Sequence, residues 1–181
     1  MSDLNNKEMA FKRRELLASA AGLALASSAA RGQVSTPMSS QIPLYMPQTE
    51  FVYEAIVDIE PSIDLGNGPL GPRAMVPITG GTFEGPNLRG TVLAGGADRQ
   101  QVRQDGVRTL DALYEMQTDD GAIITVRNQV LSIPDAETRF SFIQITAPEQ
   151  YAWLNKSIHV GTLNSLRPGR AAVLIRAYRI K

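Results

Sequence analysis

Charged side chains gather between residues 95 and 122, in the stretch GGADRQQVRQDGVRTLDALYEMQTDDGA. Asp98 and Arg99 stand side by side there, shortly after the glycine pair Gly95-Gly96. A carboxylate beside a guanidinium can polarise a carbonyl group or accept a proton, and burial would raise the pKa of the carboxyl group. Asp98 and Arg99 are therefore candidate catalytic residues. For Asp98, capping of backbone amides in a turn is an equally good interpretation.

Asp111 and Tyr114 are two further candidates for catalysis. Asp111 lies between Leu110 and Ala112, in a stretch that alternates like a strand. If Asp111 points to the interior it is a candidate acid or base, and in the opposite register it is a solvated surface group. Tyr114 can present a hydroxyl group to a pocket while its ring supplies apolar surface, or it can simply pack in the core. The sequence leaves these alternatives open.

The other aspartates of the stretch are typical of turns. Asp105-Gly106 is a common turn pair, and Thr118-Asp119-Asp120-Gly121 between two apolar runs predicts a hairpin. One adjacent pair of carboxylates supplies too few oxygens for calcium. We therefore expect structural roles at both places.

Few other side chains suit metal or nucleophilic chemistry. The chain has no Cys and one His, His159, so disulfides are excluded and a transition-metal site is unexpected. We find no nucleophile elbow of an esterase and no glycine loop that opens a phosphate-binding helix. We expect neither a metal nor a cofactor, with an all-oxygen calcium or magnesium site as the one open alternative. A structural role is the preferred interpretation of His159.

Short alternating stretches separated by Gly, Pro and Asp turns follow residue 50. The hydrophobic period is two in Phe51–Ile59. After a loop at 61–72, strands are expected at residues 73–78, 87–93, 109–117, 122–126, 140–146, 156–162 and 171–180, with one helical turn at 148–154. About eight evenly spaced strands predict an all-β fold, a sandwich or a closed antiparallel barrel. We expect the barrel, of about eight strands, which holds side chains or one small ligand inside. The last strand is apolar on both faces, which indicates either a wall buried on two sides or an outer face covered by another subunit, and we expect a homo-oligomer.

The N-terminus is typical of an export signal. Lys12, Arg13 and Arg14 precede a short Ala- and Leu-rich segment and then Ser27-Ser28-Ala29-Ala30. Paired arginines before a mildly apolar segment resemble a twin-arginine signal. We expect a signal at 1–32, a linker at 33–49, the barrel at 50–181 and a periplasmic or secreted protein. Since 3 of the 18 acidic and 5 of the 18 basic residues lie in 1–32, cleavage would leave a net charge of −2.

Motifs from residue 76 onward resemble one known family. VPITGGTFEGP at 76–86, LRGTV at 88–92 and GGAD at 95–98 are followed in order by DG, LDA, TDDGA and YAWLN. This order resembles the domain-of-unknown-function family three-two-three-seven, a family of bacterial and fungal proteins. The resemblance covers about residues 50–181 and implies a closed barrel of roughly eight strands, often oligomeric, without an established reaction.

Three positions depart from the pattern of this family. Arg99 stands where Trp is usual, Leu113 where Arg is frequent, and Gln129 where Gly is common. If the usual Trp and Arg line the pocket of the family, the ligand or the chemistry of this chain would differ from that of its relatives.

Five more residues are candidates for ligand binding. Tyr53 and Tyr178 can present hydroxyl groups, Trp153 and Asn155 would close the rim of a pocket, and Arg89 belongs to the LRG motif. Core packing is the alternative for each aromatic residue.

Three functions remain open at this stage. The barrel could be an enzyme that acts on a small, mainly apolar molecule by cofactor-free acid–base chemistry, as an isomerase, lyase or hydrolase. It could instead be a non-catalytic, lipocalin-like periplasmic carrier, or a purely structural oligomer. A near-neutral chain without a basic patch makes nucleic acid an unexpected partner, and no stable membrane span is expected after signal cleavage.

Overall fold

The computed structural model describes residues 43–181. The expected export signal and residues 33–42 of the expected linker lie outside the described residues. Residues 43–48 are exposed and have no regular secondary structure. Within residues 43–181, no helix is long and apolar enough to cross a membrane.

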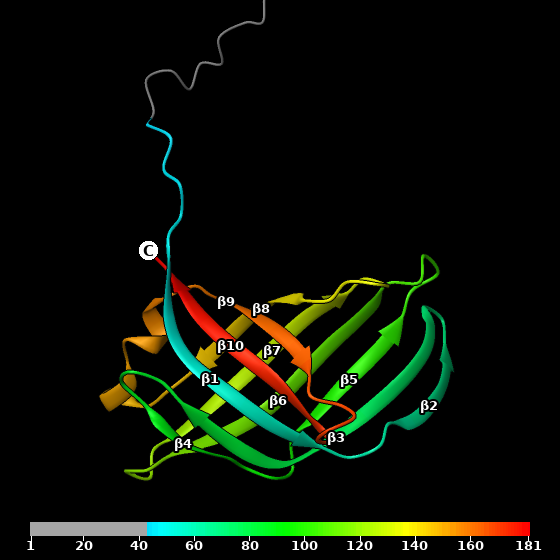
Figure 1. The fold of residues 1–181 in the computed structure, drawn as a ribbon, viewed down its shortest axis with the longest axis horizontal. Helices are drawn as coiled ribbons and strands as arrows, with labels where there is room; N and C mark the ends of the chain where they lie inside the picture. The colour runs from blue at the N-terminus through cyan, green and yellow to red at the C-terminus, as the bar shows by residue number, and fades with distance from the viewer. Residues whose placement is uncertain (1–42) are drawn as a thin grey trace, which may run out of the picture. The chain divides into compact units, whose positions relative to one another are not determined.

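The described chain is all-β and forms one antiparallel sheet of ten strands (Figure 1). Two short 3₁₀ turns, η2 (Glu149–Tyr151) and η3 (Leu154–Lys156), separate β8 from β9. The strands are β1 (Thr49–Ile59), β2 (Ile63–Gly68), β3 (Gly71–Glu84), β4 (Arg89–Val92), β5 (Ala97–Val102), β6 (Arg108–Thr118), β7 (Ile123–Ser132), β8 (Arg139–Thr146), β9 (His159–Ser165) and β10 (Ala172–Ile180).

The sheet closes on itself because β1 pairs with both β10 and β3. The first half of β3 pairs with β2 and β5, and its second half pairs with β1 and β4. In the same way, β6 pairs with β5 and then with β4. These pairings confirm the predicted closed antiparallel barrel of eight strands, with two extra strands.

In the strands of the barrel wall, alternate residues point inward and form the core. In β1, Ala55 and Val57 are almost fully buried, and a bulge next to Tyr53 lets Val52 and Tyr53 both turn inward. Facing residues complete the core, among them Ile78, Phe83, Val92, Met116, Ile124, Val126, Ile143, Leu163, Ile175 and Ala177. The period of two that the sequence shows is therefore the inside–outside period of the barrel wall.

The end of the barrel where β1 begins is closed by η2 and η3, in orange in Figure 1. Leu154 from η3 is 1% exposed and enters the core. The Asn155 side chain accepts a hydrogen bond from the Ala147 N–H and donates one to the Ala147 carbonyl, both at 2.8 Å. The guanidinium of Arg179 lies 5.4 Å from the centre of the Trp153 ring. Trp153 and Asn155 thus hold this closed end together.

Two strands appear where the sequence predicts none. β2 falls in the expected loop at 61–72, and β5 carries the polar run Ala-Asp-Arg-Gln-Gln-Val. Neither has the alternation of apolar residues that marks a strand, because β2 is exposed on nearly its whole length and β5 is rich in polar side chains. Pairing with β3 holds both of them in place.

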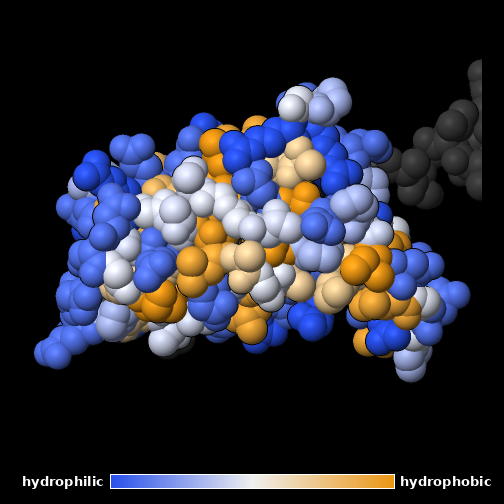
Figure 2. Space-filling model, turned by 90° about the horizontal axis from the view of Figure 1, so that it is seen from below, coloured by the Kyte–Doolittle hydropathy of each residue, from blue (hydrophilic) through white to orange (hydrophobic). Residues whose placement is uncertain are grey.

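The outer surface mixes apolar and polar residues, as Figure 2 shows for one face. On β8, Phe140 and Phe142 point outward and are 73% and 45% exposed. The expected homo-oligomer would cover such side chains, and it stays a prediction.

Candidate functional site

The register of the sheet places Asp98, Ala112 and Asn128 next to one another on three adjacent strands. Asp98 of β5 pairs with Ala112 of β6, and Ala112 pairs with Asn128 of β7. Directly paired residues point to the same face of a sheet, and all three line the cavity of the barrel. Two residues further along β6, Tyr114 faces the same interior and has no exposed surface. The interior of the barrel thus brings together the acid of Asp98, the amide of Asn128 and the phenol of Tyr114.

One oxygen of Asp98 is held and the other is free. Gln100 donates a hydrogen bond from Nε2 to Asp98 Oδ2 at 2.6 Å, and Gln100 Oε1 accepts one from Arg108 at 3.2 Å. Asp98 Oδ1 is buried and has no hydrogen-bond partner among the described residues. Burial raises the pKa of Asp98, and the hydrogen bond from Gln100 offsets part of that rise. Asp98 is thus a carboxyl group that gains protons readily and faces a cavity.

Tyr114 and Tyr53 carry two buried phenol groups in the same interior. Neither ring has exposed surface, and neither hydroxyl has a hydrogen-bond partner among the described residues. Burial raises the pKa of both phenols, and for Tyr53 the neighbouring Tyr114 adds to the rise. Both groups therefore stay protonated at neutral pH, and Tyr114, which lines the cavity, can donate a hydrogen bond to a ligand.

Gly96 allows Tyr114 to lie where it does. A Cβ atom at Gly96 would come within 2.5 Å of the Tyr114 Cβ and 2.7 Å of the Leu113 carbonyl oxygen. Gly96 thus allows a close approach of the strand that carries Tyr114.

The cavity has a volume of about 90 Å³ and lies toward the end of the barrel where β1 ends, opposite η2 and η3. Its walls are mainly apolar, and its polar lining comes from Asp98, Gln100, Tyr114 and Asn128. An engineered protein cavity of about 150 Å³ binds benzene. The interior thus admits a small group, and a larger ligand has to keep its remainder in the mouth of the barrel.

A larger and more open groove lies along the outer side of β7 and β8. It has a volume of about 580 Å³, and its mainly apolar wall includes Leu131, Ile133, Phe140 and Phe142. Arg139 is its only ionisable side chain, and the Arg139 Nε donates to Ser132 Oγ at 2.8 Å. The groove lacks an acid or base, so the interior cavity is the better candidate for a chemical site.

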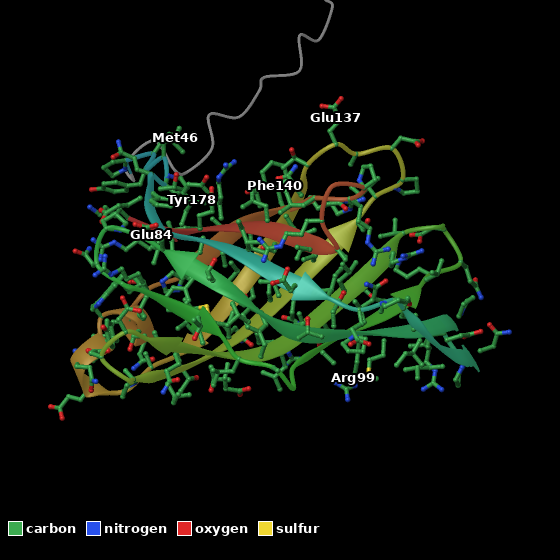
Figure 3. The ribbon with its side chains drawn as sticks, turned by 60° about the horizontal axis from the view of Figure 1, so that its bottom comes forward. Met46, Glu84, Arg99, Glu137, Phe140 and Tyr178 are labelled. Atoms are coloured by element: carbon green, nitrogen blue, oxygen red, sulfur yellow. The ribbon has the colours of Figure 1, made fainter. Side chains whose placement is uncertain are left out.

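Arg99 and Asp111 lie outside the barrel, apart from Asp98 and Tyr114. Asp111 pairs in register with Arg99 and accepts hydrogen bonds from Arg127 Nε at 2.8 Å and Arg127 Nη2 at 2.6 Å. The hydrogen bond from Arg127 lowers the pKa of Asp111. Arg99 points away from the barrel (Figure 3). The inward orientation considered for Asp111 is therefore wrong, because Leu110 and Ala112 take the inward positions and Asp111 takes the outward one.

The five ligand-binding candidates are also dispersed. Only Tyr53 lies in the interior. Arg89 forms an exposed ion pair with Asp119 at 2.8 Å, and Tyr178 packs against Phe51 with ring centres 5.9 Å apart on the outer side. Trp153 and Asn155 are engaged at the closed end, as described above.

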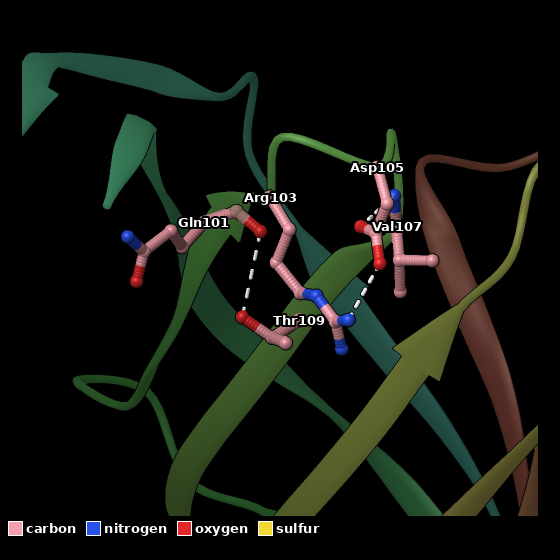
Figure 4. Close-up of polar contacts among 5 residues, drawn as sticks. All are labelled: Gln101, Arg103, Asp105, Val107 and Thr109. Carbon is pink, nitrogen blue, oxygen red and sulfur yellow. Dashed lines mark hydrogen bonds and ion pairs between the residues drawn. The ribbon is translucent and has the colours of Figure 1, made fainter.

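The expected turn roles of the other aspartates are confirmed. Asp105 accepts hydrogen bonds from the Val107 N–H at 3.2 Å and from Arg103 at 2.5 Å, which ties the β5–β6 turn together (Figure 4). At the β6–β7 hairpin, Asp120 accepts hydrogen bonds from the hydroxyl groups of Thr118 and Tyr151. Among the described residues, no group of three or more His, Cys, Asp and Glu side chains could hold a metal ion.

Sequence reasoning missed Asn128 and Gln100. Asn128 interrupts the apolar positions of β7 at a place where Val126 and Val130 face the core. A polar residue at an inward position is a recognisable signal once the register is known. For Gln100 the sequence offers no signal, because β5 itself was not predicted.

Comparison with known proteins agrees with the motifs. The model of the family described as "Protein of unknown function (DUF3237)" matches residues 47–140. The chain belongs to this family. Arg99, Leu113 and Gln129, where departures from the family pattern are expected, occupy one outward-facing region, since Gln129 pairs with Asp111 and Leu113 is 49% exposed. None of these three residues is among those that line the interior cavity.

Relatives of the chain include uncharacterised proteins and one enzyme. A UPF0311 protein from Clostridium acetobutylicum is 38% identical over 88 residues, which cover 48% of this chain and 56% of that protein. The hydroalkoxylation enzyme phnH from Penicillium herquei is 34% identical over 116 residues, 64% of this chain and 74% of the enzyme. A β-barrel-like protein from Acinetobacter baumannii has a TM-score of 0.68 at 32% identity, covering 78% of this chain and all of that one. The match spans little more than half the length of the first of these relatives.

Proposed function

We propose that the barrel binds a small, mainly apolar molecule in its interior and acts on it by acid–base chemistry without a cofactor. The observation that carries the proposal is the free Oδ1 of Asp98, which faces a mainly apolar cavity while Oδ2 is held by Gln100. Burial raises the pKa of this carboxyl group, so it spends more time as a neutral acid than an exposed aspartate does. A general acid in such a setting contributes roughly 10²- to 10⁴-fold to a rate.

The similarity to a hydroalkoxylation enzyme favours one reaction class, the addition of the O–H bond of an alcohol or phenol across an alkene, which forms an ether. Protonated Asp98 would donate its proton to one alkene carbon, and the hydroxyl oxygen of the ligand would bond to the other. The hydroxyl proton then passes to the Asp98 carboxylate, which restores the acid. No electrons are exchanged with a second molecule, so the step needs no oxidant or reductant. In this proposal the buried phenol of Tyr114, which lines the same cavity, orients the hydroxyl group.

Blocking the cavity tests where the reaction takes place. Ala112→Leu adds bulk between Asp98 and Asn128, and we expect it to lower turnover of 2-prenylphenol at least tenfold. This probe carries an alkene and a hydroxyl group on one ring, and its cyclic ether product has the same mass, so chromatography with NMR measures the conversion. Leu113→Phe, on the neighbouring outward position, is the matched control and should retain activity.

Thermal unfolding checks that both variants fold, since overpacking a core costs about 1–3 kcal/mol. Full turnover by folded Ala112→Leu would place the reaction outside the cavity. Probe binding to the wild type without any conversion would favour the carrier function over the enzyme.

We further propose that the protein is exported through the twin-arginine signal expected at residues 1–32. The support is the pair Arg13-Arg14 ahead of the mild apolar segment. Replacing both arginines by lysine keeps the charge but removes the pair, and we expect precursor to accumulate in the cytoplasm. Cell fractionation followed by blotting measures it, and undiminished export of the double-lysine variant would contradict the signal.

A further inference from the structure

Among residues 43–181, Asn128 is the one fully buried amide that lines the interior cavity. Its side chain is 1% exposed, and neither Oδ1 nor Nδ2 has a hydrogen-bond partner among the described residues. It pairs with Ala112 on one side and Ile143 on the other, and both of these neighbours are apolar. An amide that is buried without partners destabilises a fold, whereas an apolar residue of similar shape would not. In a barrel with a purely structural role, Asn128 would therefore only lower the stability of the fold.

The missing partner has to offer both a donor and an acceptor. The amide oxygen of Asn128 accepts hydrogen bonds, and its NH₂ group donates them. A ligand that pairs with both atoms carries an acceptor and a donor on neighbouring atoms, as in a lactam, an enolised hydroxy-ketone or a neutral carboxylic acid. This requirement holds whichever way round the amide lies, because both of its polar atoms are unpaired.

The same row of residues sets the size of such a ligand. Asp98 and Asn128 are separated by the single strand position of Ala112, which places their backbones roughly 10 Å apart across two strand spacings. The short side chain of Ala112 leaves the space above it to the cavity. A six-membered ring with its polar edge on Asn128 would fill this space toward the free Oδ1 of Asp98, with its remainder in the mouth of the barrel.

We propose that Asn128 is the polar anchor of the binding site and that the ligand is a ring with adjacent donor and acceptor groups, which Asn128 binds while the rest of the ring lies toward Asp98. This inference rests on the proposed function only in taking the barrel interior as the ligand site. Asn128 is assigned a role in binding and specificity, whereas Asp98 carries the chemistry.

Three rings of equal size test the anchor directly. The probes are 2-pyridone, with a donor and an acceptor side by side; pyridine, with an acceptor only; and benzene, with neither. Ligands of this size reach millimolar affinity at best in most sites, so NMR titration of the full chain is the suitable measurement. We expect the wild type to bind 2-pyridone about tenfold or more tightly than benzene, with pyridine between them.

Asn128→Leu should abolish this preference and raise the unfolding temperature by about 3–8 °C, because it removes an unpaired buried amide. Asn128→Ala removes both polar atoms without adding bulk, and it should abolish the preference for 2-pyridone even if the leucine variant fails to fold. Ser141→Ala is the matched control, since Ser141 Oγ is also buried and unpaired but does not line the cavity. It should leave the order of the probes unchanged.

Two results would overturn the proposal: no binding of 2-pyridone to the wild type, or the same order of probes in wild type and Asn128→Leu. An unchanged order of probes is expected if Asn128 binds only an ordered water molecule. Failure of the proposed catalysis looks different, because the wild type would then still prefer 2-pyridone but would not convert 2-prenylphenol.

Discussion

Asp98→Asn should lower turnover at least about 100-fold. At the same time it should make the barrel more stable near neutral pH. The loss of activity follows because an amide has no proton to donate, which removes the contribution of a general acid. The shape of the side chain is kept, and its oxygen can still accept the hydrogen bond from Gln100 Nε2. Reduced activity without a loss of folding would identify Asp98 as a chemical group.

The pH dependence of stability gives an independent readout of the same residue. Burial raises the pKa of Asp98 in the folded protein above its value of about 3.9 in an unfolded chain. The folded state therefore favours the protonated form, and the stability that this provides is present below about pH 4 and is lost as the pH rises through the folded pKa. We expect Asp98→Asn to unfold at a higher temperature than the wild type at pH 7, by roughly 2–4 °C for about 1 kcal/mol. The difference should shrink at pH 4.

Asp111→Asn is the matched control, and the pH dependence of its effect on stability should be the opposite of that of Asp98→Asn. The hydrogen bond from Arg127 lowers the pKa of Asp111, so its contribution to stability is present at neutral pH and is lost as the pH falls through the folded pKa. This pair is exposed and contributes at most about 1 kcal/mol. Differential scanning calorimetry from pH 3 to pH 8 measures all three proteins. An Asp98→Asn variant that is less stable than the wild type at pH 7 would show that Asp98 has a structural role.

Gly96→Ala should destabilise the barrel by about 3 kcal/mol or more. The new Cβ would lie 2.5 Å from the Tyr114 Cβ, 2.7 Å from the Leu113 carbonyl oxygen and 2.9 Å from the Tyr114 Cα. These atoms belong to the backbone or are fixed to it, so the strands β5 and β6 have to separate. The movement would also displace the Tyr114 phenol from the cavity.

Chemical denaturation measures this loss, with Gly169→Ala as control. Gly169 is exposed, and a Cβ there would meet only the Leu166 carbonyl oxygen at an ordinary distance of 3.6 Å. We expect that control to change stability by less than about 0.5 kcal/mol. A stable Gly96→Ala protein with unchanged near-ultraviolet dichroism would mean that the contact between Gly96 and Tyr114 is looser than the structure has it.

Local features of the sequence were enough to predict most of the barrel wall. The alternation in Phe51–Ile59 and the Asp-Gly pairs at 105–106 and 120–121 depend on neighbours within a few residues, so they could be interpreted without the fold. β2 and β5 were not predicted because their own side chains do not favour a strand. Each of them forms a strand because it pairs with β3.

The sequence by itself determined the all-β class, the turns and the family motifs, and it drew attention to Asp98 and Tyr114. Only the tertiary structure decided that Arg99 and Asp111 face outward while Asn128 joins Asp98 inside. The physical reason is the register of the strands. Successive residues of a strand point to opposite faces, so a shift of one residue would exchange the inner and outer sets. The register is fixed by pairing between strands that are distant in sequence and by packing of the whole core. A local stretch of sequence contains neither kind of information.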